Sequence, residues 1–281
     1  MAMTIKLGLI LILLAALAFG AFIFSRGADG SKATATPSQG RAARGLTGAA
    51  VLVELFTSEG CSSCPPADEV LTRLEEDQPV PGVEVVALGH HVDYWDRLGW
   101  RDPFSSADFS RRQSEYAAAF GRNDVYTPQM VVDGRIEFVG SNLARAREAI
   151  ETAAANPKAG VRIRLLDAGT KEGELPLAIN VENLPEASAT DVAEVWLAVT
   201  ESGLKSSVSR GENTGRKPSH SAVTRRLERI GEIEPGKSAF EAKRIARVEK
   251  DWKSGDLRIV VFVQERASRR VIGAASLRLE R

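Results

Sequence analysis

The first half of the chain carries apolar runs that alternate with a segment of helical periodicity. The run from Ala49 to Phe56 predicts a buried strand, and the run from Val83 to Gly89 predicts a second one. A strand, a helix and a strand in so short a length imply parallel pairing through a right-handed crossover. The helix between them is predicted by apolar residues at helical spacing: Ala67, Val70, Leu71 and Leu74.

A second helix, a hairpin and a third helix are predicted next. Ser105 or Ser106 can cap the second helix, which ends at Gly121. Asp133-Gly134 stands between two apolar runs and is a strong signal for a two-residue hairpin. A last helix is expected from about 142 to 155, so the predicted order of elements is βαβαββα.

Beyond Pro157 the pattern changes to short candidate strands separated by turn residues. Such a pattern, without a long helix, predicts a β-sandwich. The expected fold is therefore an α/β domain over 48–155, with a helical insertion, followed by an all-β, sandwich-like domain over 158–281. The candidate strands are 161–165, 177–181, 192–199, 222–227, 240–248, 257–263 and 271–279.

The N-terminal segment has the composition of an export signal. Residues 7–24 carry no charge and follow Lys6 and the terminal amine. This pattern fits a signal peptide, with a small-x-small cleavage site at 16–18, or a marginal membrane anchor. We expect the rest of the chain to be exported, either periplasmic or secreted, and in the second case above to be anchored to the inner membrane by residues 7–24. Residues 25–47, rich in small and polar residues, are predicted to be a flexible linker.

Charge and sequence signatures narrow the possible functions. The 37 Lys and Arg residues balance 37 Asp and Glu residues, so the net charge gives no electrostatic argument for binding nucleic acid. No nucleotide-binding, metalloprotease or serine-hydrolase signature occurs in the sequence. The cysteines are therefore the most informative residues.

The only two cysteines, Cys61 and Cys64, stand between the first predicted strand and the first predicted helix. Consecutive prolines are tolerated only in the first helical turn, so Pro65-Pro66 favour Ser63 as the cap and place Cys64 at the helix start. A helix N-terminus stabilises a thiolate. We expect Cys61 to be the exposed, attacking thiol of a redox pair and Cys64 to be the resolving thiol. A structural disulfide and a partial metal site are the alternatives.

A cluster of polar and aromatic residues follows the second predicted strand. Both parallel strands end at the same edge of the sheet, where ligand chemistry gathers in α/β proteins. These residues are therefore candidates to lie near the thiols and bind substrate, although loop residues are also commonly held by local hydrogen bonds alone. They are His90, His91, Asp93, Tyr94 and Trp95.

The βαβαββα order, with Cys-x-x-Cys after the first strand, resembles the thioredoxin fold over about 48–155. The resemblance implies that Thr127-Pro128, which opens the third strand, is a cis peptide facing the cysteines. It also implies that Thr127 offers its backbone to an extended substrate. The sequence departs from the thioredoxin pattern at Glu59-Gly60, where a tryptophan is common, and at Ser62-Ser63, where Gly-Pro is common.

Three segments together, 56–68, 91–96 and 126–130, are similar to a family of secreted bacterial thioredoxin-like proteins of unknown function. That resemblance implies the fold and export, and it implies no particular substrate.

These features predict a cell-envelope thiol–disulfide oxidoreductase that uses no cofactor and acts on protein thiols and disulfides. One alternative is a module for Cu(I) or another soft metal, held by Cys61, Cys64 and either His90 or His91, since adjacent strand residues point to opposite faces. Another is a non-enzymatic adaptor that uses the same fold as a scaffold.

The segment 209–220 is the one chemically dense stretch of the second half. Its residues Arg210, Arg216, Lys217 and His220 are able to hold an anion or an acidic partner. A solvated loop tip is the preferred interpretation, because basic clusters on exposed loops are common.

Overall fold

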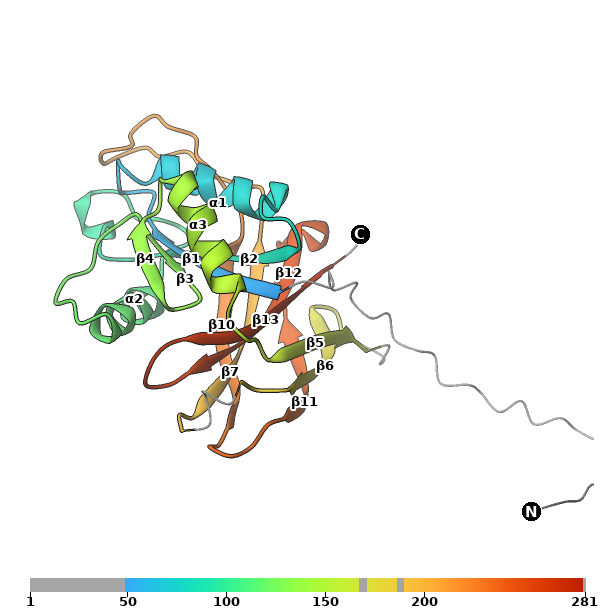
Figure 1. The fold of residues 1–281 in the computed structure, drawn as a ribbon. Coiled ribbons are helices and arrows are strands. Elements are labelled where there is room, and N and C mark those ends of the chain that lie inside the picture. Colours follow the sequence, from blue (N-terminus) through green and yellow to red (C-terminus); the bar gives the residue numbers. More distant parts are fainter. Residues whose placement is uncertain (1–48, 167–170, 186–189, 280–281) are drawn as a thin grey trace, which may run out of the picture. The chain divides into compact units, whose positions relative to one another are not determined.

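The computed structural model describes residues 49–166, 171–185 and 190–279, which all lie in one compact unit (Figure 1). The expected signal or anchor segment 7–24 and the expected linker 25–47 lie outside the described residues. Within the described part, no helix is both long enough and apolar enough to cross a membrane.

The first half has the predicted order of elements. Strand β1 pairs parallel with β2, in register from Ala49 opposite Val83 to Thr57 opposite His91, and antiparallel with β3. The hairpin between β3 and β4 turns at Asp133-Gly134, both with positive φ, as the sequence predicts. The elements are β1 (Ala49–Thr57), α1 (Pro65–Asp77), β2 (Val83–His91), the short 3-10 helix η1 (Asp96–Leu98), α2 (Ala107–Ala119), β3 (Gln129–Val132), β4 (Ile136–Val139) and α3 (Leu143–Ala154).

The second half is built from strands, as predicted. They are β5 (Gly160–Leu165), β6 (Glu174–Glu182), β7 (Ala193–Glu201), β8 (Leu204–Lys205), β9 (Ser219–His220), β10 (Val223–Ile233), β11 (Phe240–Arg247), β12 (Leu257–Glu265) and β13 (Val271–Arg278), with a 3-10 turn, η3 (Ser254–Asp256), before β12.

One sheet runs through both halves, so the expected boundary between 155 and 158 does not divide the fold. Its eight strands lie in the order β13-β12-β7-β10-β2-β1-β3-β4. The junction is between β10 and β2, where Val223 pairs with Gly89 and the Gly89 N–H donates to the Ala222 carbonyl at 2.7 Å. A Cβ at position 89 would lie 3.3 Å from that carbonyl oxygen, so glycine permits this close approach.

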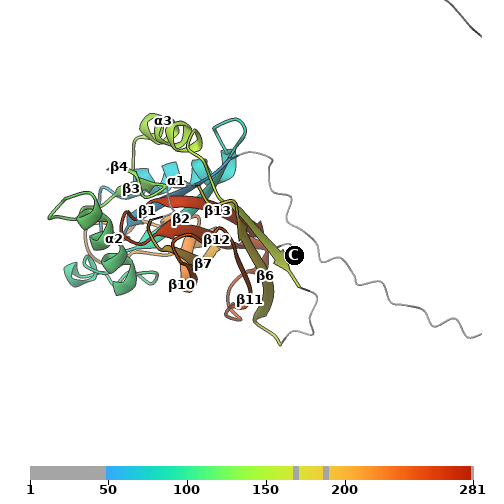
Figure 2. The ribbon, with the colours of Figure 1, turned by 60° about the horizontal axis from the view of Figure 1, so that its bottom comes forward.

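One face of this sheet is covered by helices at one end and by a small sheet at the other. Helices α1 and α3 pack over β1, β2 and β3 on this face, and α2 lies on the opposite face of the large sheet (Figure 2). Further along the first face, a three-stranded sheet in the order β11-β6-β5 packs against β7, β10, β12 and β13. The sandwich-like packing expected of the second half is therefore present, but one of its layers is the sheet that the first half also uses.

The other face of the large sheet encloses a third apolar cluster. Its members come both from β1 and β2 and from β7, β12 and β13, so the sheet curves around it: Leu52, Val86, Leu88, Ala198, Val260, Phe262, Val271 and Ala274. Burying each of the larger side chains contributes about 1.5–3 kcal/mol. The two halves therefore share a core as well as a sheet.

Candidate functional site

The two cysteines form a disulfide at the turn between β1 and α1. The Cα atoms of Cys61 and Cys64 lie 5.4 Å apart, and Cys64 is the N-cap residue of α1. Its carbonyl accepts hydrogen bonds from the N–H groups of Ala67 and Asp68, at 2.8 and 3.1 Å. The predicted cap, Ser63, is wrong by one residue, because its hydroxyl lies 3.4 Å from the Cys61 sulfur instead of capping the helix.

The prediction that Cys61 is exposed is wrong. Both cysteines have 0% of their surface exposed. The segment 206–218, which joins β8 to β9 and which we call the strap, bonds to the backbone of the cysteine turn. The strap is itself ordered by backbone hydrogen bonds, including one from the Val208 N–H to the Arg216 carbonyl at 3.0 Å. The interpretation of the segment 209–220 as a solvated loop tip is confirmed for Arg210, Arg216 and Lys217, which are exposed, and is wrong for Asn213 and His220, which are buried.

Two strap residues hold the cysteine turn directly. The Asn213 amide nitrogen donates to the carbonyls of Glu59 and Cys61, at 2.8 and 2.9 Å, and this side chain is buried. The neighbouring Glu212 carboxylate accepts a hydrogen bond from the Ser62 N–H at 3.1 Å. Hydrogen bonding from the Ser62 side chain, together with this backbone bond, holds the pKa of Glu212 below its ordinary value. The turn and the strap are thus bonded through backbone groups that any sequence at 59–62 would supply.

Glu59 is the buried centre of the site. Its carboxylate receives donors from Trp100 Nε1 at 2.8 Å, Ser206 Oγ at 2.5 Å and His220 Nε2 at 3.1 Å. Its own N–H donates to the Asp102 carboxylate at 2.8 Å. The Glu59 side chain, two positions before Cys61, therefore connects the cysteine turn to the loop after β2, to the strap and to β9.

A buried histidine and carboxylate group lies beneath this centre. His91 Nδ1 lies 2.7 Å from Asp102 Oδ2. Burial disfavours the charged form of both groups, but the opposite charge of the partner outweighs this effect. The pKa of His91 is therefore raised and that of Asp102 is lowered. The His91 and His220 rings meet edge to face at 4.7 Å, and His220 Nδ1 lies 3.8 Å from Asp68. Burial raises the pKa of Asp68, against the opposing effect of His220.

His90 points to the other side of β2 and belongs to a different buried network, as strand alternation predicts. Its Nε2 lies 2.9 Å from Glu54 Oε1, which also accepts from Arg112 Nε at 2.6 Å. Arg112 further donates to Tyr116 on its own helix and to Gln264 on β12. Burial lowers the pKa of His90, so it is held neutral. This network ties α2 to both halves of the sheet.

The remaining predicted site residues divide into two groups. Asp93 and Tyr94 make local bonds to α2, through Ser110 Oγ at 2.5 Å and Gln113 Oε1 at 3.2 Å. Trp95 instead donates from Nε1 to Thr127 Oγ1 at 2.8 Å, and a Cβ at Gly60 would lie 3.0 Å from its Cβ.

The structure thus links the cysteine turn to the third strand through Trp95 and Thr127. The Thr127–Pro128 peptide bond is cis, as the resemblance implies.

Several residues of the site are not predicted from sequence, among them Glu59, Asp102, Glu212 and Asn213. Glu59 enters the sequence analysis only as a departure from the thioredoxin pattern, and Asp102 lies between the predicted cluster 90–95 and the second predicted helix. Nothing in the sequence pattern connects 212–213 with 59–61, because the pairing is made across about 150 positions. In the described part of the chain, no group of three or more His, Cys, Asp or Glu side chains is arranged to hold a metal ion. Cys61, Cys64, His90 and His91 are therefore not assembled there as a ligand set.

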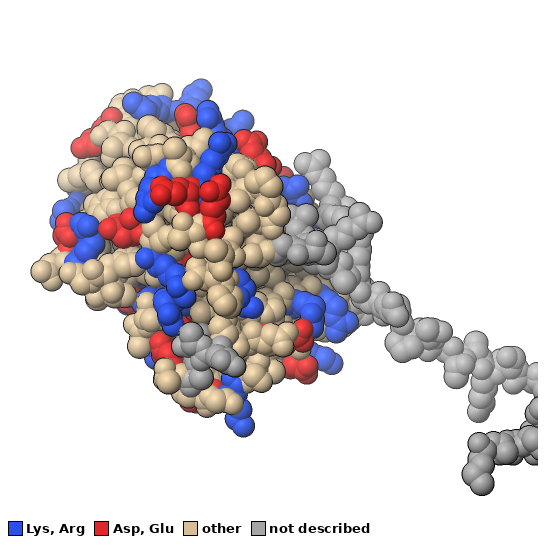
Figure 3. All heavy atoms as spheres, viewed as in Figure 1, with Lys and Arg blue, Asp and Glu red and all other residues tan. Residues whose placement is uncertain are grey.

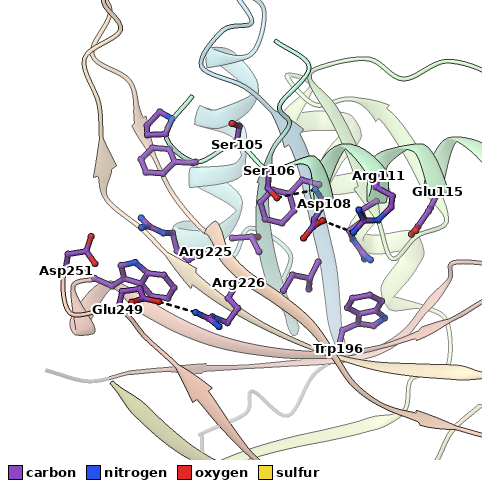
Figure 4. A pocket seen from close by; sticks show the side chains of 17 residues that line it. Ser105, Ser106, Asp108, Arg111, Glu115, Trp196, Arg225, Arg226, Glu249 and Asp251 are labelled. Atoms are coloured by element: carbon purple, nitrogen blue, oxygen red, sulfur yellow. Dashed lines mark hydrogen bonds and ion pairs between the residues drawn. The ribbon is translucent and has the colours of Figure 1, made fainter. Parts of the chain in front are cut away.

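A hollow of about 560 Å³ lies between α2 and β10, next to the group that contains His91 and His220 (Figure 4). Its charged walls are paired: Arg111 with Asp108 at 2.7 Å, and Arg226 with Glu249 at 3.2 Å. Phe104 lines the hollow, and its ring lies 5.4 Å from the His91 ring. Acidic and basic side chains are likewise intermixed over the molecular face in Figure 3, in keeping with the zero net charge.

Comparison with known proteins assigns the family. The chain matches, over residues 52–264, the model of a family described as a protein of unknown function, DUF1223, and it belongs to that family. The match spans both halves of the shared sheet. No curated protein matches the sequence.

Two solved structures are similar to this chain. A crystal structure of a protein from Agrobacterium tumefaciens is 27% identical, with a TM-score of 0.61, and the alignment covers 82% of this chain and 94% of that one. HBP35 of Porphyromonas gingivalis is 15% identical, with a TM-score of 0.61, over 83% of this chain and 76% of that one. The second likeness concerns the fold alone.

Proposed function

We propose that this member of the DUF1223 family is a thiol–disulfide oxidoreductase of the cell envelope, with a thioredoxin-like arrangement in its first half. The observation that carries the proposal is the Cys61–Cys64 disulfide at the N-terminus of α1, directly after a central parallel strand. The free N–H groups and partial positive charge at this end of a helix lower the pKa of a thiol and activate it.

Cys61 is the better candidate for the attacking sulfur. Cys64 is the helix cap, with its backbone engaged in the first turn, whereas Cys61 precedes the helix. The Cys61 sulfur lies beside the exposed Ser63 hydroxyl, which is able to donate a hydrogen bond to a thiolate. Thr127, held by Trp95 next to the cysteine turn, is the candidate for contacting an extended substrate backbone.

The reaction proceeds by two exchanges. In the reduced protein, the Cys61 thiolate attacks a client disulfide, forms a mixed disulfide and releases one client thiolate. The Cys64 thiolate then attacks the Cys61 sulfur, which releases the second client thiolate and closes the Cys61–Cys64 bond. The client gains two electrons, and a dithiol reductant must restore the enzyme. In the opposite direction the protein oxidises a client dithiol, and a disulfide oxidant restores it.

An exported location is part of the proposal. Disulfides form and persist mainly in oxidising compartments, and the pair is closed here. The apolar, charge-free run 7–24 supplies a means of export.

The test is to trap clients in cells that express the protein. A Cys64→Ser protein cannot resolve a mixed disulfide, so we expect it to accumulate covalent adducts that dithiothreitol releases. A Cys61→Ser protein is the matched control and should accumulate none. If neither variant forms adducts above the level of the double variant, and the purified protein equilibrates with glutathione no faster than a Cys-x-x-Cys peptide, the proposal is wrong.

A further inference from the structure

The exchange proposed above requires a sulfur atom that a client can reach, and the structure offers none in its present arrangement. Cys61 and Cys64 are both fully buried. Exchange proceeds by direct attack of one sulfur on another, so access controls its rate. Something must therefore move before the disulfide reacts.

The strap is the element best placed to move. It is an excursion of thirteen residues, 206–218, between two-residue strands that pair only with each other. Most of its residues are exposed, and Gly211 and Gly215 adopt positive φ within it. Short, exposed, locally bonded segments such as this one are the parts of a protein that open most readily without global unfolding.

The bonds that close the strap are few and separable from the bonds that shape it. The closing bonds are those from Asn213 to the Glu59 and Cys61 carbonyls, that from Ser62 to Glu212 and, at the first residue of the strap, that from Ser206 Oγ to the Glu59 carboxylate. The shaping bonds, such as that from Thr214 Oγ1 to the Gly211 carbonyl at 2.6 Å, stay within the strap. The strap is therefore able to lift as one piece and keep its own turn.

Closure also leaves a polar atom of the strap unpaired. Asn213 Oδ1 is buried and has no hydrogen-bond partner among the described residues. Burying a polar group without a partner opposes the buried state, and lifting the strap would expose this atom to water. The closed arrangement is thus held by a small surplus of interactions, as a movable segment requires.

We infer that the strap is a gate over the Cys61–Cys64 disulfide and that Asn213 is its latch. This inference rests on the proposed oxidoreductase function and assigns the control of access to a segment far away in the sequence. Asn213 is a positioning residue, because its amide holds carbonyls of the cysteine turn and makes no bond to sulfur. Opening the gate exposes Cys61, which lies beside the already exposed Ser63, to a client.

The test measures access to the disulfide with a small reductant, so that it does not depend on catalysis. Purified full-length protein is mixed with dithiothreitol, and released thiols are trapped with iodoacetamide and counted by mass. Asn213→Ala removes both closing bonds of the latch, and we expect it to raise the rate constant of reduction roughly tenfold or more. Thr214→Ala is the matched control, since it removes a shaping bond of the same strap, and we expect it to stay near the wild-type rate.

Urea distinguishes a gate from a fixed cover. Reduction through local opening depends weakly on urea below the unfolding transition, whereas reduction through global unfolding rises with the full equilibrium slope. We expect the weak dependence in wild type and in Asn213→Ala. A steep dependence in both, or equal reduction rates in Asn213→Ala and Thr214→Ala, would overturn the gate.

The outcomes also separate the gate from the function it rests on. If Asn213→Ala is reduced faster, with weak urea dependence, but Cys64→Ser traps no client, the gate stands and the oxidoreductase proposal fails. If Cys64→Ser traps clients while the latch variant is reduced no faster than its control, the function stands and the gate fails.

Discussion

Glu54 on β1 and Arg112 on α2 form a fully buried ion pair, with Arg112 Nε 2.6 Å from Glu54 Oε1. The guanidinium also lies over three aromatic rings, those of Tyr116, Trp196 and Phe262, at 5.1 to 5.6 Å. Two of these rings belong to the second half of the chain. The pair therefore connects the two halves. Burial disfavours the charged form of each partner, and the opposite charge of the other partner outweighs this effect.

Removing one partner of this pair should be costly. Arg112→Leu leaves the Glu54 carboxylate buried without its cation, and we expect a loss of about 3–5 kcal/mol in the free energy of unfolding, measured with urea. Arg111→Ala removes an exposed ion pair on the neighbouring position of the same helix. We expect this control to change stability by no more than about 0.5 kcal/mol. Equal effects of the two substitutions would contradict the assignment.

Glu59→Gln should loosen the site without changing its shape. The amide offers one acceptor oxygen where the carboxylate offers two, and its NH₂ group would face Trp100, Ser206 or His220, which all donate in this structure. We expect a loss of about 1–3 kcal/mol in thermal or urea unfolding, together with faster reduction of the disulfide. Glu69 is exposed, so Glu69→Gln is the control. If the Glu59→Gln protein were as stable as this control, the central role of Glu59 would be refuted.

The hairpin between β3 and β4 should reject any side chain at Gly134. This glycine has φ of +62°, and a Cβ there would lie 1.9 Å from the Arg269 carbonyl oxygen. Gly121, at the end of α2, has φ of +69° with open space around it. We expect Gly121→Ala to cost about 1 kcal/mol for its backbone conformation. Gly134→Ala should cost about 1–3 kcal/mol more, because the β12–β13 turn must also move. Similar losses in urea unfolding would show that the close contact is unimportant.

The His91–Asp102 pair should give the protein a defined dependence on pH. The pKa of His91 is raised in the folded state, so its contribution to stability is complete below its ordinary value of 6.5 and is lost as pH rises through the folded-state value. The pKa of Asp102 is lowered, so its contribution is present above its ordinary value of 3.8 and is lost as pH falls through the folded-state value.

Asp102→Asn should therefore be least stable, relative to wild type, between these limits, and the difference should shrink at alkaline pH. The chain has three histidines, so their ring protons can be followed separately by NMR. We expect one of them, His91, to titrate above 6.5 in wild type and to shift downward in Asp102→Asn. A His91 resonance that titrates below 6.5 in wild type would contradict the pairing.

Local features of this fold follow from local sequence. The apolar run at 49–56 forms β1, Pro65-Pro66 stand in the first turn of α1, and Asp133-Gly134 make the hairpin turn. Each of these depends on residues within a few positions of one another. The alternation of His90 and His91 across β2 was predictable for the same reason, and it separates the two buried networks.

Apart from the cap of α1, which lies one residue from its predicted place, the misplaced expectations involve contacts between distant residues. Nothing near Gly89 reveals that β10 pairs beside it, so the sequence suggested two domains where one sheet exists. Nothing near Cys61 reveals that Asn213 bonds to its carbonyl or that its sulfur is buried, so this sulfur was expected to be exposed. Pairings of this kind depend on which surfaces meet after the strands have formed, and a single sequence carries no local pattern for them.

The junction of Val223 with Gly89 also limits how this protein can be dissected. A fragment that ends near residue 156 would strip β2 of its neighbour and leave Leu52, Val86 and Leu88 facing water. Such a piece would be prone to self-association, and its cysteine turn would lack the bonds from Glu212 and Asn213 of the strap. Biochemistry on the isolated Cys-x-x-Cys half would thus report on a different molecule.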